Sequence, residues 1–239
     1  MKLFYCLIMS LFISNVLQGQ SFQTDERVWN SATQRAFSDL GRTKLTKPVL
    51  GNIVGSEYYE TEFKEGRIVH LDKSLEIKTS LRYNAYNDEI ELIDMSSGTK
   101  SVKAAIKNSR IISFFDNNEY NYLKYLDSKN IASTGYLIPV FKGLKIEIHE
   151  RKRKKFIKGK ASVNSFDIEH KPKFVDDIQY FLSYKGSTPE YIKITKKSIL
   201  KFFNKSEEVL NFIKKNKIKN GDLTSLIKIV EFYENNSSI

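Results

Sequence analysis

The chain has 239 residues, a formal net charge of +11 and a single cysteine. Its hydrophobic content of 41% and aromatic content of 13% favour a folded protein over a disordered one. The excess of positive charge favours acidic partners in general.

The N-terminus predicts export. Lys2 precedes an apolar run from residue 3 to residue 17, and Gly19 is a small residue at a suitable cleavage position. The run is shorter than the roughly 20 residues that a transmembrane helix needs, so residues 1–19 are interpreted as a signal peptide. We therefore expect a protein of the periplasm or the cell exterior, with no transmembrane span in the mature chain and no nucleic-acid partner. Cys6 lies in the signal peptide, which excludes disulfides, cysteine nucleophiles and thiolate metal sites from the mature protein.

Residues 20–50 are interpreted as a helical and linker segment. The apolar spacing of residues 24–40 is typical of a helix, with Thr24 as a possible cap and Gly41 just past its end. Glycines and a proline between residues 41 and 56 indicate a linker.

Residues 51–195 are interpreted as a β-rich domain, because the apolar period changes to two. The clearest strand is 75–84, and it shows the alternation of an antiparallel sheet with one wet face. Further strands are expected at 109–115, 119–126, 134–141, 144–150, 178–184 and 190–195. In the strand 144–150, Leu144 is expected to point inward and His149 outward. The fold class is thus α+β, predominantly antiparallel β, arranged as a meander, a sandwich or a curved open sheet.

The stretch LRYNAYNDEIEL, residues 81–92, predicts a hairpin. Its register would place Leu81 opposite Leu92, and three further pairs follow from it. The residues of this motif are Arg82, Tyr83, Asn84, Asp88, Glu89 and Glu91, with Arg82 facing Glu91, Tyr83 facing Ile90 and Asn84 facing Glu89. A structural role is favoured over an active site, because exposed charge pairs on a sheet are common.

The pattern LRYNxxxDEIE resembles the hallmark of an uncharacterised family of secreted, β-rich bacterial proteins. Upstream positions of the family match Gly55, Ser56, Tyr58 and Gly66. The resemblance covers roughly residues 51–235 and implies a basic stretch, a tyrosine-rich strand and a lysine-rich helical C-terminus. It implies no catalytic residue.

Residues 151–173 are polar and basic and are interpreted as a long loop. The candidate residues for contact with an anionic surface are Arg151, Lys152, Arg153, Lys154, Lys155, Lys158 and Lys160. In this interpretation two apolar neighbours dip into the surface. The alternative, which we favour, is a solvated loop that protects a strand edge.

Residues 196–239 are interpreted as a helical segment with Ser206 and Asp222 as N-caps. No motif of a catalytic or metal site appears elsewhere, because His70, His149 and His170 lack metal-site spacing and no GxSxG turn exists. We expect no cofactor.

The sequence thus favours an exported, non-enzymatic envelope protein that binds another envelope protein or an anionic lipid or glycan surface. The first alternative is a carrier that holds an apolar ligand in its curved sheet. The weaker alternative is a hydrolase with a dispersed site.

Overall fold

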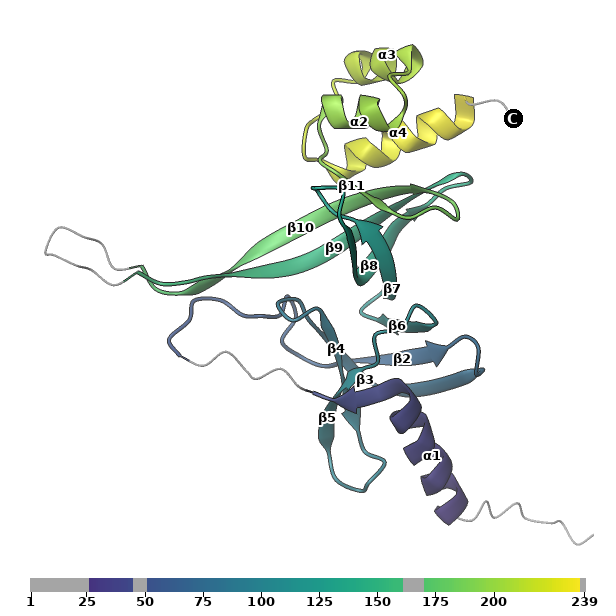
Figure 1. Ribbon diagram of the computed structural model, residues 1–239, viewed down its shortest axis with the longest axis vertical. Coiled ribbons are helices and arrows are strands. Elements are labelled where there is room, and N and C mark those ends of the chain that lie inside the picture. The colour runs from purple at the N-terminus through teal and green to yellow at the C-terminus, as the bar shows by residue number, and fades with distance from the viewer. Residues whose placement is uncertain (1–25, 45–50, 161–169, 237–239) are drawn as a thin grey trace, which may run out of the picture.

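A computed structural model describes residues 26–44, 51–160 and 170–236, with the side chains of residues 26–30 left out (Figure 1). The predicted signal peptide and Thr24 lie outside these residues. None of the helices described in these ranges is long and apolar enough to cross a membrane.

The described residues form helices at both ends of the chain and strands between them. The helices are α1 (Glu26–Leu40), α2 (Lys196–Phe202), α3 (Glu207–Lys215) and α4 (Leu223–Asn236). The strands are β1 (Gly41–Thr43), β2 (Lys64–His70), β3 (Leu75–Asn84), β4 (Glu89–Asp94), β5 (Ser101–Ala105), β6 (Ile111–Phe115), β7 (Asn118–Leu126), β8 (Ala132–Lys142), β9 (Ile146–Ile157), β10 (Lys173–Tyr184) and β11 (Glu190–Ile192). The predicted class, α+β with mainly antiparallel strands, is confirmed.

The strands form one sheet in the order β1-β5-β4-β3-β2-β6-β7-β11-β10-β9-β8, and β8 also pairs with β7. The strands β7 to β11 therefore close into a ring, which no expected arrangement included. All the pairs are antiparallel except that of β11 with β7. In Figure 1 the lower half contains α1 and β1 to β6, and the upper half contains the ring beneath α2 to α4.

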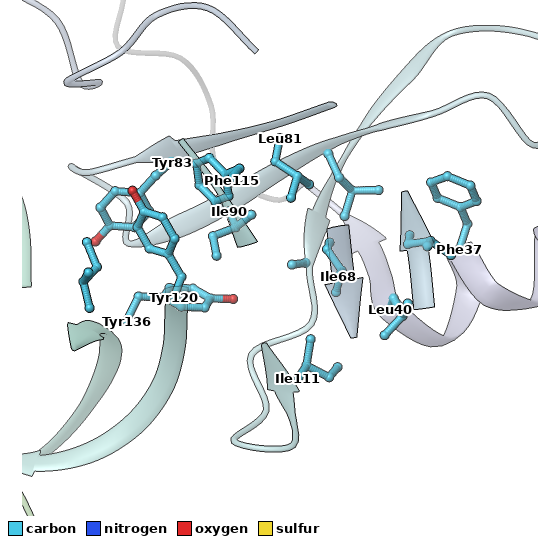
Figure 2. Close-up of a cluster of buried hydrophobic side chains, with 14 of the residues drawn as sticks. Phe37, Leu40, Ile68, Leu81, Tyr83, Ile90, Ile111, Phe115, Tyr120 and Tyr136 are labelled. Carbon is cyan, nitrogen blue, oxygen red and sulfur yellow. The ribbon is translucent and has the colours of Figure 1, made fainter. Parts of the chain in front are cut away.

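Two large hydrophobic cores are present among the described residues, and one of them extends across both halves. In the lower half Phe37 and Leu40 of α1 pack beside Ile68 and Leu81, as Figure 2 shows. In the upper half, buried residues of β9, β10 and β11 pack against α2, α3 and α4. The first of these cores also contains residues of the ring strands, namely Tyr120 of β7 and Tyr136 and Ile138 of β8. Apolar packing therefore joins the lower half to the ring.

The predicted loop at 151–173 is wrong for most of its described residues. Residues 151–157 continue β9, and β10 begins at Lys173, so the two strands form a long antiparallel ribbon. Residues 161–169 lie outside the described ranges. The strand was missed because its basic side chains conceal the alternation that identifies a half-buried strand.

Two side-chain orientations predicted for the strand 144–150 are also wrong. Leu144 lies before the strand begins and is 79% exposed. His149 is buried rather than wet, and its imidazole lies beside Ser183 of β10. The predicted linker likewise contains a short strand, since β1 pairs with β5 directly after α1.

The predicted C-terminal helices are confirmed, together with their caps. The hydroxyl of Ser206 accepts a hydrogen bond from the amide of Val209, and the carboxylate of Asp222 accepts one from the amide of Ser225. The N-terminal helix is confirmed as α1, which ends directly before Gly41.

Candidate functional site

The β3–β4 hairpin has the predicted register. Leu81 pairs with Leu92, and the other three pairs are Arg82 with Glu91, Tyr83 with Ile90 and Asn84 with Glu89. The expectation of a wet polar face is nevertheless wrong at this end of the strands. Asn84 and Glu91 are both 0% exposed, so the carboxylate of the charge pair is buried, while its Arg82 partner is 20% exposed.

Glu91 is the centre of a buried hydrogen-bond network. The Arg82 Nη2 atom lies 2.5 Å from Glu91 Oε2, and the Tyr58 hydroxyl donates to Oε1 at 2.9 Å. Lys44 forms a further ion pair with the same carboxylate. The Arg82 guanidinium also stacks on the Tyr58 ring at 4.0 Å and on the Phe63 ring at 4.3 Å. The irregular segment before β2 therefore covers the polar face of the hairpin.

The network keeps Glu91 ionised. Burial raises the pKa of Glu91, but the hydrogen bonds from Lys44, Arg82 and Tyr58 outweigh this effect and lower the pKa below its usual value. Burial and the adjacent Glu91 carboxylate raise the pKa of Tyr58, so its phenol stays neutral and donates. A carboxylate that is kept ionised in this way stabilises the hairpin and is poorly suited to act as a general acid or base.

A second buried carboxylate, Asp88, lies in the turn of the same hairpin, with a left-handed φ of 56°. The Tyr83 hydroxyl donates to Asp88 Oδ1 at 2.7 Å. Arg151 Nη2 and Arg153 Nη1 lie 2.9 and 3.3 Å from Asp88 Oδ2. These three residues, Asp88, Arg151 and Arg153, are called the Asp88 clamp below. It joins the lower half of the molecule to β9.

Neighbouring contacts reinforce the Asp88 clamp. Arg153 donates from Nε to the carbonyl of Ala85 at 2.6 Å and from Nη2 to that of Tyr86 at 2.5 Å. The Tyr86 ring in turn packs against two phenylalanines of the β9–β10 ribbon. At Gly135 of β8 a Cβ atom would lie 2.6 Å from Asp88 Oδ2, so only glycine fits beside the carboxylate.

The other basic residues of β9 also have carboxylate partners. The Nζ atom of Lys154 lies 2.5 Å from Asp176 Oδ1, and that of Lys155 lies 2.8 Å from Asp177 Oδ1. The Nζ atom of Lys152 lies 3.7 Å from Glu150 Oε2. The five basic side chains at 151–155 are therefore internally paired. Lys158 and Lys160, the last two candidates, follow β9 and are exposed, with no ion pair to a described residue.

A larger group of unpaired cations lies elsewhere, on the C-terminal helices and the segments beside them. Residues 193–236 contain ten lysines against five acidic residues. All ten lysines are exposed, and none forms an ion pair with another described residue. We call this group the lysine cap: Lys193, Lys196, Lys197, Lys201, Lys205, Lys214, Lys215, Lys217, Lys219 and Lys228. The family resemblance implied a lysine-rich helical C-terminus, but sequence reasoning did not select these residues as a site, because the lysines are scattered over three helices and the segments beside them.

The described residues do not form a catalytic centre of a familiar kind. They contain no cluster of three or more potential metal ligands. The Ser183 hydroxyl lies 3.4 Å from His149 Nε2, and Glu147 lies 3.4 Å from the same nitrogen. A triad needs the acid on the opposite ring nitrogen, and Ser183 is buried. Burial lowers the pKa of His149, which favours a neutral, structural imidazole.

The tyrosines of the ring strands serve mainly in packing. Tyr120 and Tyr136 each contact the Tyr83 ring of β3 between the halves (Figure 2), and Tyr125 packs edge-on against Phe181 with ring centroids 4.8 Å apart. A groove of about 860 Å³ beside Gly66 and Lys78 has a mixed polar and apolar lining. Neither feature is the continuous apolar concavity that a lipid carrier would need.

Comparison with known proteins does not identify a relative. No protein-family model matches the chain, and neither a curated protein nor a solved structure matches it. The resemblance to secreted β-rich bacterial proteins stays a prediction, and the functional argument has to be built from the geometry.

Proposed function

We propose that the protein is an exported, non-enzymatic binding module of the cell envelope, and that it holds an anionic envelope component on the lysine cap. One observation carries the proposal. The basic residues of β9 are neutralised by internal carboxylates, whereas the ten lysines of the cap are exposed and without ion pairs among the described residues.

Electrostatics favours this surface as a binding face. Like charges gathered on one cap attract anions and raise the rate of encounter, and the attraction declines when salt screens it beyond about 10 Å. The cap lysines are exposed, so their ammonium groups stay hydrated in the free protein and need no carboxylate partner within the fold. The cap is therefore available to a partner without unfolding or rearrangement.

The two alternative functions, a hydrolase and a carrier of an apolar ligand, have weaker support. A hydrolase would need convergent polar groups open to a cleft, but the carboxylates of Asp88 and Glu91 are buried and engaged by arginines. A carrier would need its aromatic strands to line a cavity, but these side chains pack into cores. Export itself is supported by the sequence of residues 1–19.

Binding of anionic vesicles and of a glucuronic-acid polymer tests the proposal. In one variant, five lysines of the cap become glutamine: Lys196, Lys197, Lys205, Lys214 and Lys215. In the matched control, five exposed lysines elsewhere become glutamine: Lys64, Lys78, Lys100, Lys124 and Lys129. Both variants have the same net charge, so a difference between them reports position rather than total charge.

We expect the unmodified protein to bind at least one of the two probes at low salt, and the cap variant to bind it at least tenfold more weakly. The control variant should lose much less. Equal losses in both variants, or no binding of either probe, would contradict the proposal.

A further inference from the structure

A groove of about 490 Å³ lies within the lysine cap, between the end of β10, the strand β11 and the helix α2. Small-molecule sites commonly have volumes of about 300–1,000 Å³. The walls of the groove combine these elements with turn and loop residues, among them Ser128, Ser187 and Thr188. Thr195, the N-cap of α2, accepts a hydrogen bond from the Ser198 amide and holds the helix start in place.

The charged groups that line the groove have no ion-pair partner among the described residues. Lys193 and Lys201 contribute two ammonium groups, and Glu190 contributes one carboxylate. Exposed lysines bind the anionic group of a ligand, whereas a carboxylate accepts hydrogen bonds from ligand hydroxyls. The groove therefore suits a ligand with both an anionic group and hydroxyls.

Hydroxyl groups complete the polar lining. Ser198 accepts a hydrogen bond from the Thr195 hydroxyl at 3.0 Å, so its own proton remains available to a ligand. Ser187 donates to the carbonyl of Tyr184 at 2.7 Å, so its oxygen can still accept. Donors and acceptors thus alternate within one groove, which is the pattern that a polyhydroxylated ligand needs.

Aromatic rings supply a rigid apolar surface beside these polar groups. Tyr184 is 38% exposed and stacks on Phe202, with ring centroids 5.3 Å apart and planes 10° apart. Burial and the neighbouring Tyr233 raise the pKa of Tyr184 to about 12, so the phenol carries no charge that would repel an anion. Stacked rings lose little entropy when a ligand packs on them.

We propose that this groove binds a short acidic saccharide, with Lys193 and Lys201 on its carboxylate and with Glu190 and Ser198 on its hydroxyls. The inference rests on the proposed function and names the ligand class of the lysine cap. No large apolar side chain of residues 193–236 itself is exposed, which favours a hydrophilic saccharide over an acidic lipid as the ligand of the groove.

Titration of the folded full-length protein with a trisaccharide of uronic acid, followed by NMR or calorimetry, tests the inference. A neutral trisaccharide of the same linkage is the control ligand. In the test variant Lys193 and Lys201 become glutamine, and in the matched variant Lys214 and Lys215 become glutamine. The latter pair belongs to the same cap but does not line the groove.

We expect the acidic trisaccharide to bind more tightly than the neutral one, and the test variant to weaken its binding by about tenfold or more. The matched variant should weaken trisaccharide binding by less than about threefold, because its two lysines affect the ligand only through the overall electrostatic field of the cap.

Absence of acidic trisaccharide binding would overturn the inference, as would equal losses in the two lysine variants. The proposed function can be judged separately. If the five-lysine cap variant loses vesicle or polymer binding while the trisaccharide does not bind, the cap binds anions but the groove is not its saccharide site.

Discussion

The basic residues of β9 and those of the lysine cap differ in how the fold uses their charge. The five consecutive basic side chains at 151–155 alternate between the two faces of a strand. Each face meets carboxylates, with Asp88 reached by Arg151 and Arg153 and with Asp176 beside Lys154. Six of the cap lysines lie on helices whose apolar faces are buried, four lie on the segments beside these helices, and all ten are exposed.

This comparison teaches that a dense run of charge in a sequence is a poor guide to a charged surface. In a strand, the neighbouring strand and any hairpin docked on it can supply the opposite charge. The cap has five acidic residues for ten lysines, and none of these lysines forms an ion pair with another described residue. The scattered lysines of the cap therefore provide more accessible charge than the contiguous run does.

Loss of the Asp88 carboxylate should have the largest effect on stability. Asp88→Ala leaves Arg151 and Arg153, whose side chains are only 12% and 19% exposed, without their carboxylate partner, which we expect to cost about 3–5 kcal/mol of unfolding free energy. Urea unfolding of the variant measures this loss. Asp176→Ala is the control, because the Asp176 side chain is 60% exposed and its ion pair with Lys154 should contribute less than about 1 kcal/mol. Equal losses would show that the Asp88 clamp is no more important than a surface pair.

The pH dependence of stability should report the Glu91 network. Hydrogen bonds hold the pKa of Glu91 below its usual value of 4.5 in the folded state. Its contribution is therefore complete above pH 4.5 and is lost as the pH falls through the lower, folded-state pKa.

The variant Glu91→Gln should be about 1–3 kcal/mol less stable at pH 7 and should lose stability less steeply in acid. Unfolding free energies measured from pH 7 to pH 3 test this. Glu76→Gln is the control, since the Glu76 side chain is 40% exposed in its ion pair with Arg67. An identical acid slope in the unmodified protein and in Glu91→Gln would contradict the role assigned to Glu91.

Replacement of cap lysines should have the smallest effect on stability. Lys214→Gln combined with Lys215→Gln removes two exposed charges that make no ion pair with a described residue. We expect a change within about 0.5 kcal/mol, measured by thermal unfolding. A loss as large as that of Asp88→Ala would mean that the cap lysines support the fold rather than remain free for binding.

The sequence predicts local pairing better than it predicts burial. The alternation in residues 75–84 and the Asn-Asp turn were sufficient for the register of the β3–β4 hairpin. The burial of its polar face was not predictable, because the residues that cover it, Tyr58 and Phe63, lie in an irregular segment without periodicity.

The second half of β9 was missed for a related reason. The Asp88 carboxylate that pairs with Arg151 lies 63 positions away, so no local pattern indicates that the arginine points inward. The lysine cap, in contrast, could have been found by counting charge along the C-terminal helices. Long-range charge pairing is the part of this structure that sequence patterns do not reveal.

Acetylation of lysines in the native protein, followed residue by residue by mass spectrometry, tests the central comparison most directly. Lys154, whose side chain is 14% exposed and paired with Asp176, should react at least several-fold more slowly than Lys214 and Lys215. The glucuronic-acid polymer should slow the cap lysines and leave Lys154 unchanged. Equal reactivity of Lys154 and the cap lysines, with no protection of the cap by the polymer, would contradict the account.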